Sequence, residues 1–312
     1  MKLKLLSWNV RGANDNSKRK IIKTFIRNQK IDLLCIQETK NQPMLEGVVR
    51  SLGSGRFVEW RALDADGVAG GLLICWDKRS LEILDWEDGQ FSLSCKFRNV
   101  EDGVVWVFTG VYGPFTKEER ECLWEEFGAI REIWEDPWCL EGDFNITLFQ
   151  RERSRQGTIT STMRRFAQII DELGLVDLPL QGGVFTWSKG LNNQSWARLD
   201  KFLVSPSWLD HFSGVLQSRL SRPISDHFPV LLKGGELRRG PSLFRFENMW
   251  LKVEGFIDLI RSWWRGIEVR GTASFRLAAK MKGIKQKLKV WNREVFGSLE
   301  CNKVSALQQV EF

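Results

Sequence analysis

The chain has 312 residues, of which 43% are hydrophobic and 27% charged, and its formal net charge at pH 7 is +7. This length allows one large domain or two smaller ones, with enough apolar side chains for a sizeable core. No apolar run approaches the roughly 20 residues needed to cross a bilayer, and the N-terminal segment lacks the long apolar stretch of a secretory signal, so we expect an intracellular protein with no membrane partner.

Predicted strands and helices alternate along residues 1–234. Period-two or continuous apolar patterns predict the strands, and apolar residues at helical spacing predict the helices. The expected strands are 2–10, 31–37, 70–76, 104–112, 138–142, 184–188, 198–204 and 228–232, and the expected helices are 17–30, 117–135 and 161–174. This interleaving favours an α/β sandwich of two packed sheets with helices outside, although periodicity alone also allows a doubly wound sheet.

The character of the sequence changes at residues 233–241, where glycine, charge and proline cluster without periodic apolar residues. We therefore expect one domain over residues 1–234 and a helical tail over 235–312, with a mostly hydrophobic helix at 249–264 and a basic helix at 275–296. Residues 1–235 hold 31 Lys and Arg against 31 Asp and Glu, and residues 236–312 hold 15 against 8, so the differences are 0 and +7. Such a tail binds a polyanion or is simply a solvated helix face.

Six short polar motifs lie at the ends of predicted strands, where loops can converge on one face. They are W-N-V-R-G (8–12), Q-E-T-K (37–40), V-Y-G-P (111–114), E-G-D-F-N (141–145), R-L-D (198–200) and S-D-H-F-P (225–229). Each alone is typical of a turn or a solvated side chain. Together they can supply what phosphodiester hydrolysis needs: an oxygen ligand for a hard cation, an activated water, and donors for charged phosphoryl oxygens.

The chemistry of these side chains suggests a role for each. Glu38 offers a carboxylate ligand for Mg²⁺ or Mn²⁺. Asp143 can take a proton from the attacking water while Asn145 orients that water. His227 can donate to a phosphoryl oxygen if a carboxylate, for which Asp200 is suited, holds its other ring nitrogen.

Taken in order, the motifs resemble the endonuclease/exonuclease/phosphatase superfamily over roughly residues 3–234. More narrowly, L-S-W-N-V-R-G, G-V-F-T-W-S, S-D-H-F-P and the tail segments F-R-F-E-N-M-W and V-W-N-R-E-V-F-G resemble endonuclease domains of plant LINE-type non-LTR retrotransposons. The resemblance implies a deoxyribonuclease-I-like, four-layer α/β sandwich of two mixed sheets flanked by helices. It also implies a metal-dependent endonuclease that nicks DNA and leaves a 3′-hydroxyl.

The resemblance further implies roles for single positions. Asn9, Glu38 and Asp226 belong to the metal site, and Tyr112 contacts the scissile phosphate. Asp143 and Asn145 position or activate water, and Asp200 pairs with His227. Thr186 and Ser225 contact the backbone of the DNA substrate. Arg11 stands where related apurinic-site repair enzymes often have Asp, so a cation there can meet phosphate instead of the metal. The chain also has R-L-D where the inositol-phosphatase branch usually has C-D-R.

Other functions stay open: an apurinic/apyrimidinic repair-type nuclease, a phosphatase of the same fold, or a catalytically inactive nucleic-acid-binding remnant. A basic cluster after G-D-F-N can grip DNA in a salt-sensitive manner or can be a solvated surface; it comprises Arg151, Arg153, Arg155, Arg164 and Arg165. No polymerase-type Asp-Asp pair is present, so we expect a chain truncated before the reverse transcriptase. A nucleus would suit a DNA nicking enzyme, but Lys18-Arg19-Lys20 is too short to indicate import, and no motif indicates a protein partner.

Overall fold

The computed structural model describes residues 3–41, 43–52, 58–65, 70–155, 157–189, 195–234, 250–251, 253–269 and 273–296. The chain divides into two compact units, Met1–Arg238 and Arg239–Phe312. Within the described ranges, no helix is both long enough and apolar enough to span a bilayer.

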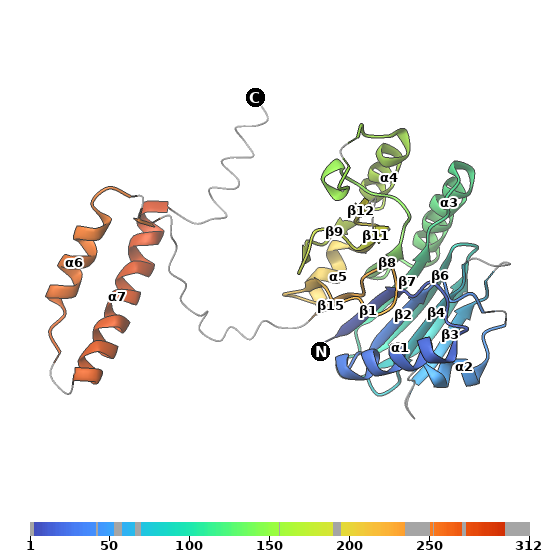
Figure 1. Cartoon of the computed structure of the whole chain (residues 1–312), viewed down its shortest axis with the longest axis horizontal. Helices are drawn as coiled ribbons and strands as arrows, with labels where there is room; N and C mark the ends of the chain where they lie inside the picture. The colour runs from blue at the N-terminus through green and yellow to red at the C-terminus, as the bar shows by residue number, and fades with distance from the viewer. Residues whose placement is uncertain are drawn as a thin grey trace. The chain divides into compact units, whose positions relative to one another are not determined.

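Two large mixed sheets form the first unit (Figure 1). The seven-stranded sheet has the order β10-β14-β15-β1-β2-β4-β3, with β10 Leu180–Gln181, β14 Leu216–Arg219, β15 Val230–Lys233, β1 Lys4–Asn9, β2 Leu33–Gln37, β4 Leu72–Asp77 and β3 Val58–Leu63. The six-stranded sheet has the order β5-β6-β7-β8-β13-β9, with β5 Leu81–Asp88, β6 Ser92–Asn99, β7 Val105–Tyr112, β8 Trp138–Asp143, β13 Asp200–Val204 and β9 Val176–Asp177. A separate hairpin joins β11 (Trp187–Lys189) and β12 (Ser195–Ala197).

The two sheets pack face to face through their inner side chains. Leu5 and Ile74 of the first sheet share one buried cluster with Phe97, Trp106 and Phe108 of the second. Strand residues alternate between faces, so the neighbouring positions of the same strands point outward to the helices. This inner layer of side chains is the main core, and it fixes the two sets of strand ends relative to each other.

Helices cover the outer face of each sheet. They are α1 (Asn16–Gln29), α2 (Glu46–Ser51), α3 (Lys117–Ile133) and α4 (Ser161–Glu172). The short helix α5 (Pro206–His211) instead buries Trp208 in the cluster between the sheets, and a 3₁₀ turn, η1 (Gln150–Glu152), follows β8. Ile22 of α1 is buried with Trp8 of β1, whereas Trp124 of α3 stacks on Phe166 of α4 above the second sheet. The order helix, sheet, sheet, helix confirms the predicted four-layer α/β sandwich and rules out the doubly wound alternative.

The structure differs from the sequence prediction at residues 184–188 and in several elements that the apolar patterns missed. The strand expected at 184–188 begins only at Trp187, after Gly182 and Gly183 adopt positive φ angles. The pattern analysis also missed the strands β3, β5, β6, β9, β10, β12 and β14 and the helices α2 and α5. A bulge between Ile83 and Asp85 interrupts the apolar alternation of β5.

In the described part of the second unit the helices are α6 (Phe256–Gly266) and α7 (Ala273–Phe296). Both lie within the predicted helical tail, although α6 begins at Phe256 and not at residue 249 as expected. Trp250, Phe256, Ile284 and Leu288 form its buried cluster. The lysines of α7 whose side chains are described lie at half-buried or exposed positions, so the helix keeps a basic surface.

Candidate active site

The predicted polar motifs meet at one edge of the paired sheets. Asn9 ends β1 and Glu38 follows β2, which runs parallel to β1. Tyr112 ends β7 and is paired in register with Asp143 at the end of β8, and Asp143 is in turn paired with Asp200 at the start of β13. Adjacent strands therefore deliver five polar side chains to the same edge.

Two glycines allow the ends of β7 and β8 to approach closely. Gly142 has a φ of +142°, and a Cβ atom there would lie 2.0 Å from the carbonyl oxygen of Val111. A Cβ on Gly113 would lie 2.4 Å from the carbonyl oxygen of Phe144. Any larger residue would push Tyr112 and Asp143 apart, which explains glycine at these places in V-Y-G-P and E-G-D-F-N.

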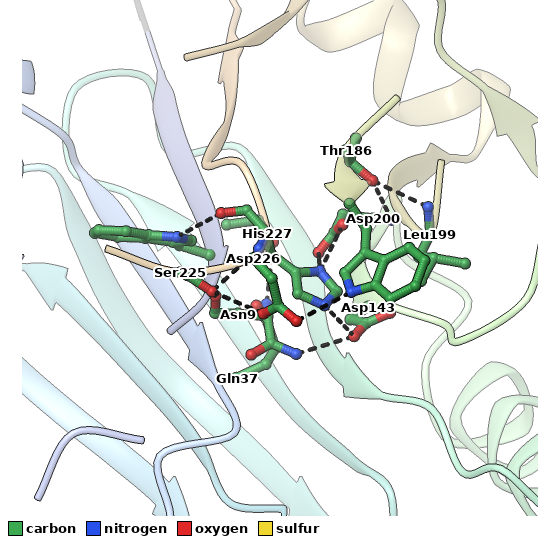
Figure 2. Close-up of polar contacts among 12 residues, drawn as sticks. Asn9, Gln37, Asp143, Thr186, Leu199, Asp200, Ser225, Asp226 and His227 are labelled. Carbon is green, nitrogen blue, oxygen red and sulfur yellow. Dashed lines mark hydrogen bonds and ion pairs between the residues drawn. The ribbon is translucent and has the colours of Figure 1, made fainter. Parts of the chain in front are cut away.

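His227 lies between two carboxylates (Figure 2). Its Nδ1 is 3.0 and 3.1 Å from the two carboxylate oxygens of Asp200, and its Nε2 is 3.6 Å from Oδ2 of Asp143. The hydroxyl of Thr186 accepts hydrogen bonds from the backbone N–H groups of Leu199 and Asp200, both at 3.0 Å. The imidazole is thus oriented by Asp200, and Asp200 is held by Thr186.

Ser225 ties the His227 loop to β1. Its hydroxyl donates to the carbonyl oxygen of Asn9 (2.8 Å) and accepts from the backbone N–H of His227 (3.1 Å). The indole of Trp8 also donates to the carbonyl oxygen of His227 (3.3 Å). These contacts fix the histidine against the strand that carries Asn9.

Asp143 is fixed through both carboxylate oxygens. Asn9 Nδ2 donates to its Oδ2 (2.9 Å), and the backbone N–H of Asn145 donates to its Oδ1 (3.0 Å). The side-chain amide of Asn145 donates to the carbonyl oxygen of Gly113 (2.7 Å). A carboxylate with fixed orientation beside a cavity is suited to receive a proton from a bound water.

Burial and neighbouring charges shift the pKa values of this cluster. Burial raises the pKa of Asp143; His227 lowers it and Asp200 raises it, and the net direction is upward. Burial lowers the pKa of His227, but Asp200 and Asp143 outweigh that effect and raise it to about 9. Burial, then Glu38 and Asp143, raise the pKa of Tyr112. At neutral pH the imidazolium and the phenol are therefore hydrogen-bond donors, while Asp143 is a stronger base than an exposed aspartate.

A cavity of about 460 Å³ opens at this edge. It is lined by Asn9, Arg11, Glu38, Tyr112, Phe115, Asp143, Asn145, Trp187, Lys189, Leu199, Asp226 and His227. Eight of the predicted site residues are in that list. Asp200, Thr186 and Ser225 lie behind it and hold the lining residues, and the buried hydroxyls of Thr186 and Ser225 bond to protein backbone.

Oxygen ligands gather on one wall of the cavity. Lys40 Nζ lies 2.9 Å from Glu38 Oε1, and Arg11 Nη1 lies 2.5 Å from Asp226 Oδ2. The amide oxygen of Asn9 accepts from the backbone N–H of Arg11 (3.0 Å). Two carboxylates, each already near a cation, and one amide oxygen form a hard donor set that fits Mg²⁺ or Mn²⁺.

A second group of possible ligand atoms belongs to Asp143, Asp200 and His227, which lie within 4.8 Å of one another. All three residues are buried, and the imidazolium already compensates the two carboxylates. The wall with Glu38 is better suited to a metal, because its carboxylates face the cavity and are not committed to a histidine.

Strained backbone is concentrated around the cavity. Arg11, Glu38, Lys40 and Asn145 have φ angles of 53°, 55°, 57° and 51°, and in the described chain the other non-glycine residue with positive φ is Lys30, at the end of α1. Such conformations cost of order 1–3 kcal/mol each and persist where the surrounding structure enforces them, typically at functional sites. Arg11, Glu38 and Asn145 line the cavity and Lys40 contacts Glu38, so the strained positions support its assignment as the active site.

The arginines after G-D-F-N do not line the cavity. The guanidinium of Arg151 lies 4.6 Å from the ring centroid of Phe149, and Arg153 Nε donates to the hydroxyl of Thr147 (2.8 Å). Arg155 is exposed. Contact between these three arginines and a DNA backbone stays a prediction.

Sequence reasoning missed several residues of this region. Phe115 and Lys189 line the cavity. Lys18 reaches back from α1 to donate to the carbonyl oxygen of Arg11 (2.9 Å). The position of Phe115 directly after Y-G-P was an available signal, whereas Lys18 required knowledge of how α1 packs.

A buried ionic network supports the R-L-D segment. Arg198 donates to Glu152 (3.1 Å) and to Asp177 (2.6 Å), and the fully buried Lys201 donates to Glu152 (2.6 Å). Glu152 belongs to the turn after G-D-F-N, so the network connects that turn to the strand that carries Asp200. Alternating apolar patterns could not reveal it, because charged residues are normally outside.

Comparison with known proteins agrees with this geometry. The model of the Endonuclease/Exonuclease/phosphatase family matches residues 6–227. The chain is 26% identical over 284 residues to the "Transposon TX1 uncharacterized 149 kDa protein" of Xenopus laevis, an alignment that covers 85% of this chain and 21% of that relative. It is 25% identical over 257 residues to an exodeoxyribonuclease of Bacillus subtilis (strain 168), covering 74% of this chain and 98% of that protein.

Solved structures share the fold. The endonuclease domain of TRAS1, a telomere-specific non-LTR retrotransposon, superposes with a TM-score of 0.57 at 15% identity and covers 76% of this chain and 100% of that domain. At this identity the likeness shows the fold alone. The family match covers residues 6–227, from W-N-V-R-G to the histidine of S-D-H-F-P. The chain belongs to the Endonuclease/Exonuclease/phosphatase family.

Proposed function

We propose that this chain is a divalent-metal-dependent endonuclease, derived from a retrotransposon, that nicks DNA and leaves a 3′-hydroxyl. The observation that carries the proposal is the meeting of Glu38, Asp143 and His227 in one cavity, with Asp200 behind the histidine. Residues 1–234 form the catalytic domain in this proposal, and residues 235–312 form a basic helical tail.

The side chains divide the work of hydrolysis. Asp143 takes a proton from a water that Asn145 helps to orient, and this water attacks the phosphorus. His227 and Tyr112 donate hydrogen bonds to the phosphoryl oxygens, whose charge grows as the new bond forms. The bond between phosphorus and the 3′-oxygen breaks, so one water adds across it and the products are a 5′-phosphate and a 3′-hydroxyl.

The metal would be held by Glu38, Asp226 and the amide oxygen of Asn9. When bound, Mg²⁺ or Mn²⁺ would stabilise negative charge on the phosphoryl and leaving oxygens. Lys40 and Arg11 pair with the two carboxylates and would also be able to contact phosphate oxygens of the substrate.

DNA is the proposed partner because cations surround the cavity. Arg11 and Lys189 line it, and Lys18 and Lys40 stand next to them. Phosphate contacts of this kind release counterions, so log Kd should rise linearly with log salt concentration. Binding that does not respond to salt would contradict a DNA-backbone partner.

The test is nicking of supercoiled plasmid with Mg²⁺, with EDTA, and by a Glu38→Ala/His227→Ala double variant. His211→Ala serves as the matched control, because His211 is the other histidine of the chain and is exposed on α5. We expect metal-dependent nicking that the double variant loses and the control keeps. Extension of the nick by a DNA polymerase would report the 3′-hydroxyl.

Two further substrates separate the related functions. Cleavage of an abasic duplex in strong preference to intact plasmid would indicate a repair-type nuclease, and hydrolysis of inositol phosphate alone would indicate a phosphatase. A well-folded wild type that binds DNA in a salt-sensitive manner but leaves all three substrates intact would be an inactive binding remnant. Each of these three results would overturn the proposed nicking function.

A further inference from the structure

A second hollow adjoins the catalytic cavity and shares a wall with it. Its volume is about 240 Å³, and Tyr112 and Phe115 line both spaces. The shared wall follows directly from Y-G-P, which carries the chain from the end of β7 across the edge of the sheets. A strand whose phosphate contacts Tyr112 would therefore present a neighbouring nucleotide to this hollow.

The lining of the hollow suits a flat apolar group. Leu63, Leu72, Phe91 and Pro114 supply aliphatic and aromatic surface at its base. The volume is below the roughly 300–1,000 Å³ of sites for drug-sized ligands, so the occupant is a small group. Phe115 lines the hollow and keeps 66% of its surface exposed, so its ring is accessible to a flat group that enters the hollow.

The charges of the hollow exclude a phosphate. Its charged lining residues in the described chain are Asp64 and Glu119, and no lysine or arginine lines it. The catalytic cavity next to it is lined by Arg11 and Lys189. A nucleic acid can satisfy both environments at once, because its phosphates are anionic and its bases are neutral, with apolar faces and hydrogen-bonding edges.

We propose that this hollow binds a nucleobase next to the scissile phosphate, and that Phe115 is the ring on which the base stacks. Asp64, Glu119 and the amide of Gln90 lie where the edge of such a base would meet hydrogen-bonding groups. The inference rests on the proposed nucleic-acid substrate and adds a recognition site to it. Phe115 acts in binding and has no part in the bond-breaking step.

The test measures binding of two fluorescently labelled single strands in EDTA: oligo(dC) and a base-free strand of equal length. Single strands avoid the energy of unpairing a base. Loss of a stacking ring weakens binding by about tenfold per base, so Phe115→Ala should weaken oligo(dC) binding by that factor and leave the base-free strand unchanged. Phe115→Trp should retain the affinity for oligo(dC).

Phe149→Ala is the matched control. Phe149 is also an exposed phenylalanine, but it lines neither hollow, so its loss should not discriminate between the two strands. Equal weakening of both strands by Phe115→Ala, or weakening of neither, would overturn the inference. Plasmid nicking by the same preparations separates the two proposals. Base-dependent binding without nicking would refute only the proposed catalytic function. Nicking without base-dependent binding would refute only the proposed base site.

Discussion

Replacement of Glu141 by glutamine should remove a loss of folding stability that this side chain causes as the pH rises. Glu141 lies on β8 between the sheets, fully buried, and Gln37 Nε2 donates to its Oε1 (3.2 Å). Burial raises its pKa from 4.5 to about 8, so the native chain keeps a proton that the unfolded chain loses above pH 4.5. At ~1.4 kcal/mol per pH unit, the free energy of unfolding should fall by about 5 kcal/mol between pH 4.5 and pH 8 on account of this group.

A loss of this size matters, because domains are typically stable by only about 5–15 kcal/mol. Glu141→Gln keeps the shape and removes the titration, so its stability relative to wild type should rise from pH 5 to pH 8 and level off above. Urea unfolding at several pH values measures the difference, with Glu87→Gln on the exposed side of β5 as control. Parallel curves for wild type and Glu141→Gln would show that the native carboxyl is already ionised, and would refute the reasoning.

Three further changes test the supports of the site. Lys201→Met breaks a fully buried ion pair with Glu152 and should destabilise the fold by about 3–5 kcal/mol in urea unfolding; a smaller loss would mean that Arg198 alone satisfies Glu152. Asp200→Asn should lower kcat for plasmid nicking by about 10²–10⁴ with little change in KM, and activity near wild type would exclude its role in holding His227. Gly142→Ala should cost more than about 1 kcal/mol of stability, whereas Gly157→Ala, where a Cβ meets no atom within 4 Å, should be tolerated.

The strand ends of the site were predictable because local pattern and position coincide there. An apolar strand that stops at a polar residue places that residue at the edge of a sheet, whatever the rest of the fold. Tyr112 and Asp143 end the parallel neighbours β7 and β8, where they are paired in register. The sequence could therefore identify the residues that line the cavity as a set. The distances between them depend on how the two sheets pack and could not be predicted.

The buried ionisable side chains were not predictable for the opposite reason. Glu141 and Lys201 lie on strands, where an alternating apolar pattern does not predict that a charged residue type will be buried. Both side chains are nevertheless fully buried. Whether a charge at such a position is tolerated depends on partners distant in sequence, such as Gln37 and Glu152. Burial of a charge is feasible only when such partners are in place, so the information lies in tertiary contacts.

The strained turns connect the stability of the sandwich to the site. Arg11, Glu38 and Asn145 hold left-handed conformations that glycine would adopt without strain, yet each carries a side chain into the cavity. Each strained residue costs of order 1–3 kcal/mol of folding stability, and a small core could not offset several of them. The two sheets and their helices bury an extensive core directly beneath these turns, and the rigid strand ends leave the turns no relaxed alternative. A large core is therefore a condition for the active-site geometry, because it holds ligands and donors in place before any metal or DNA binds.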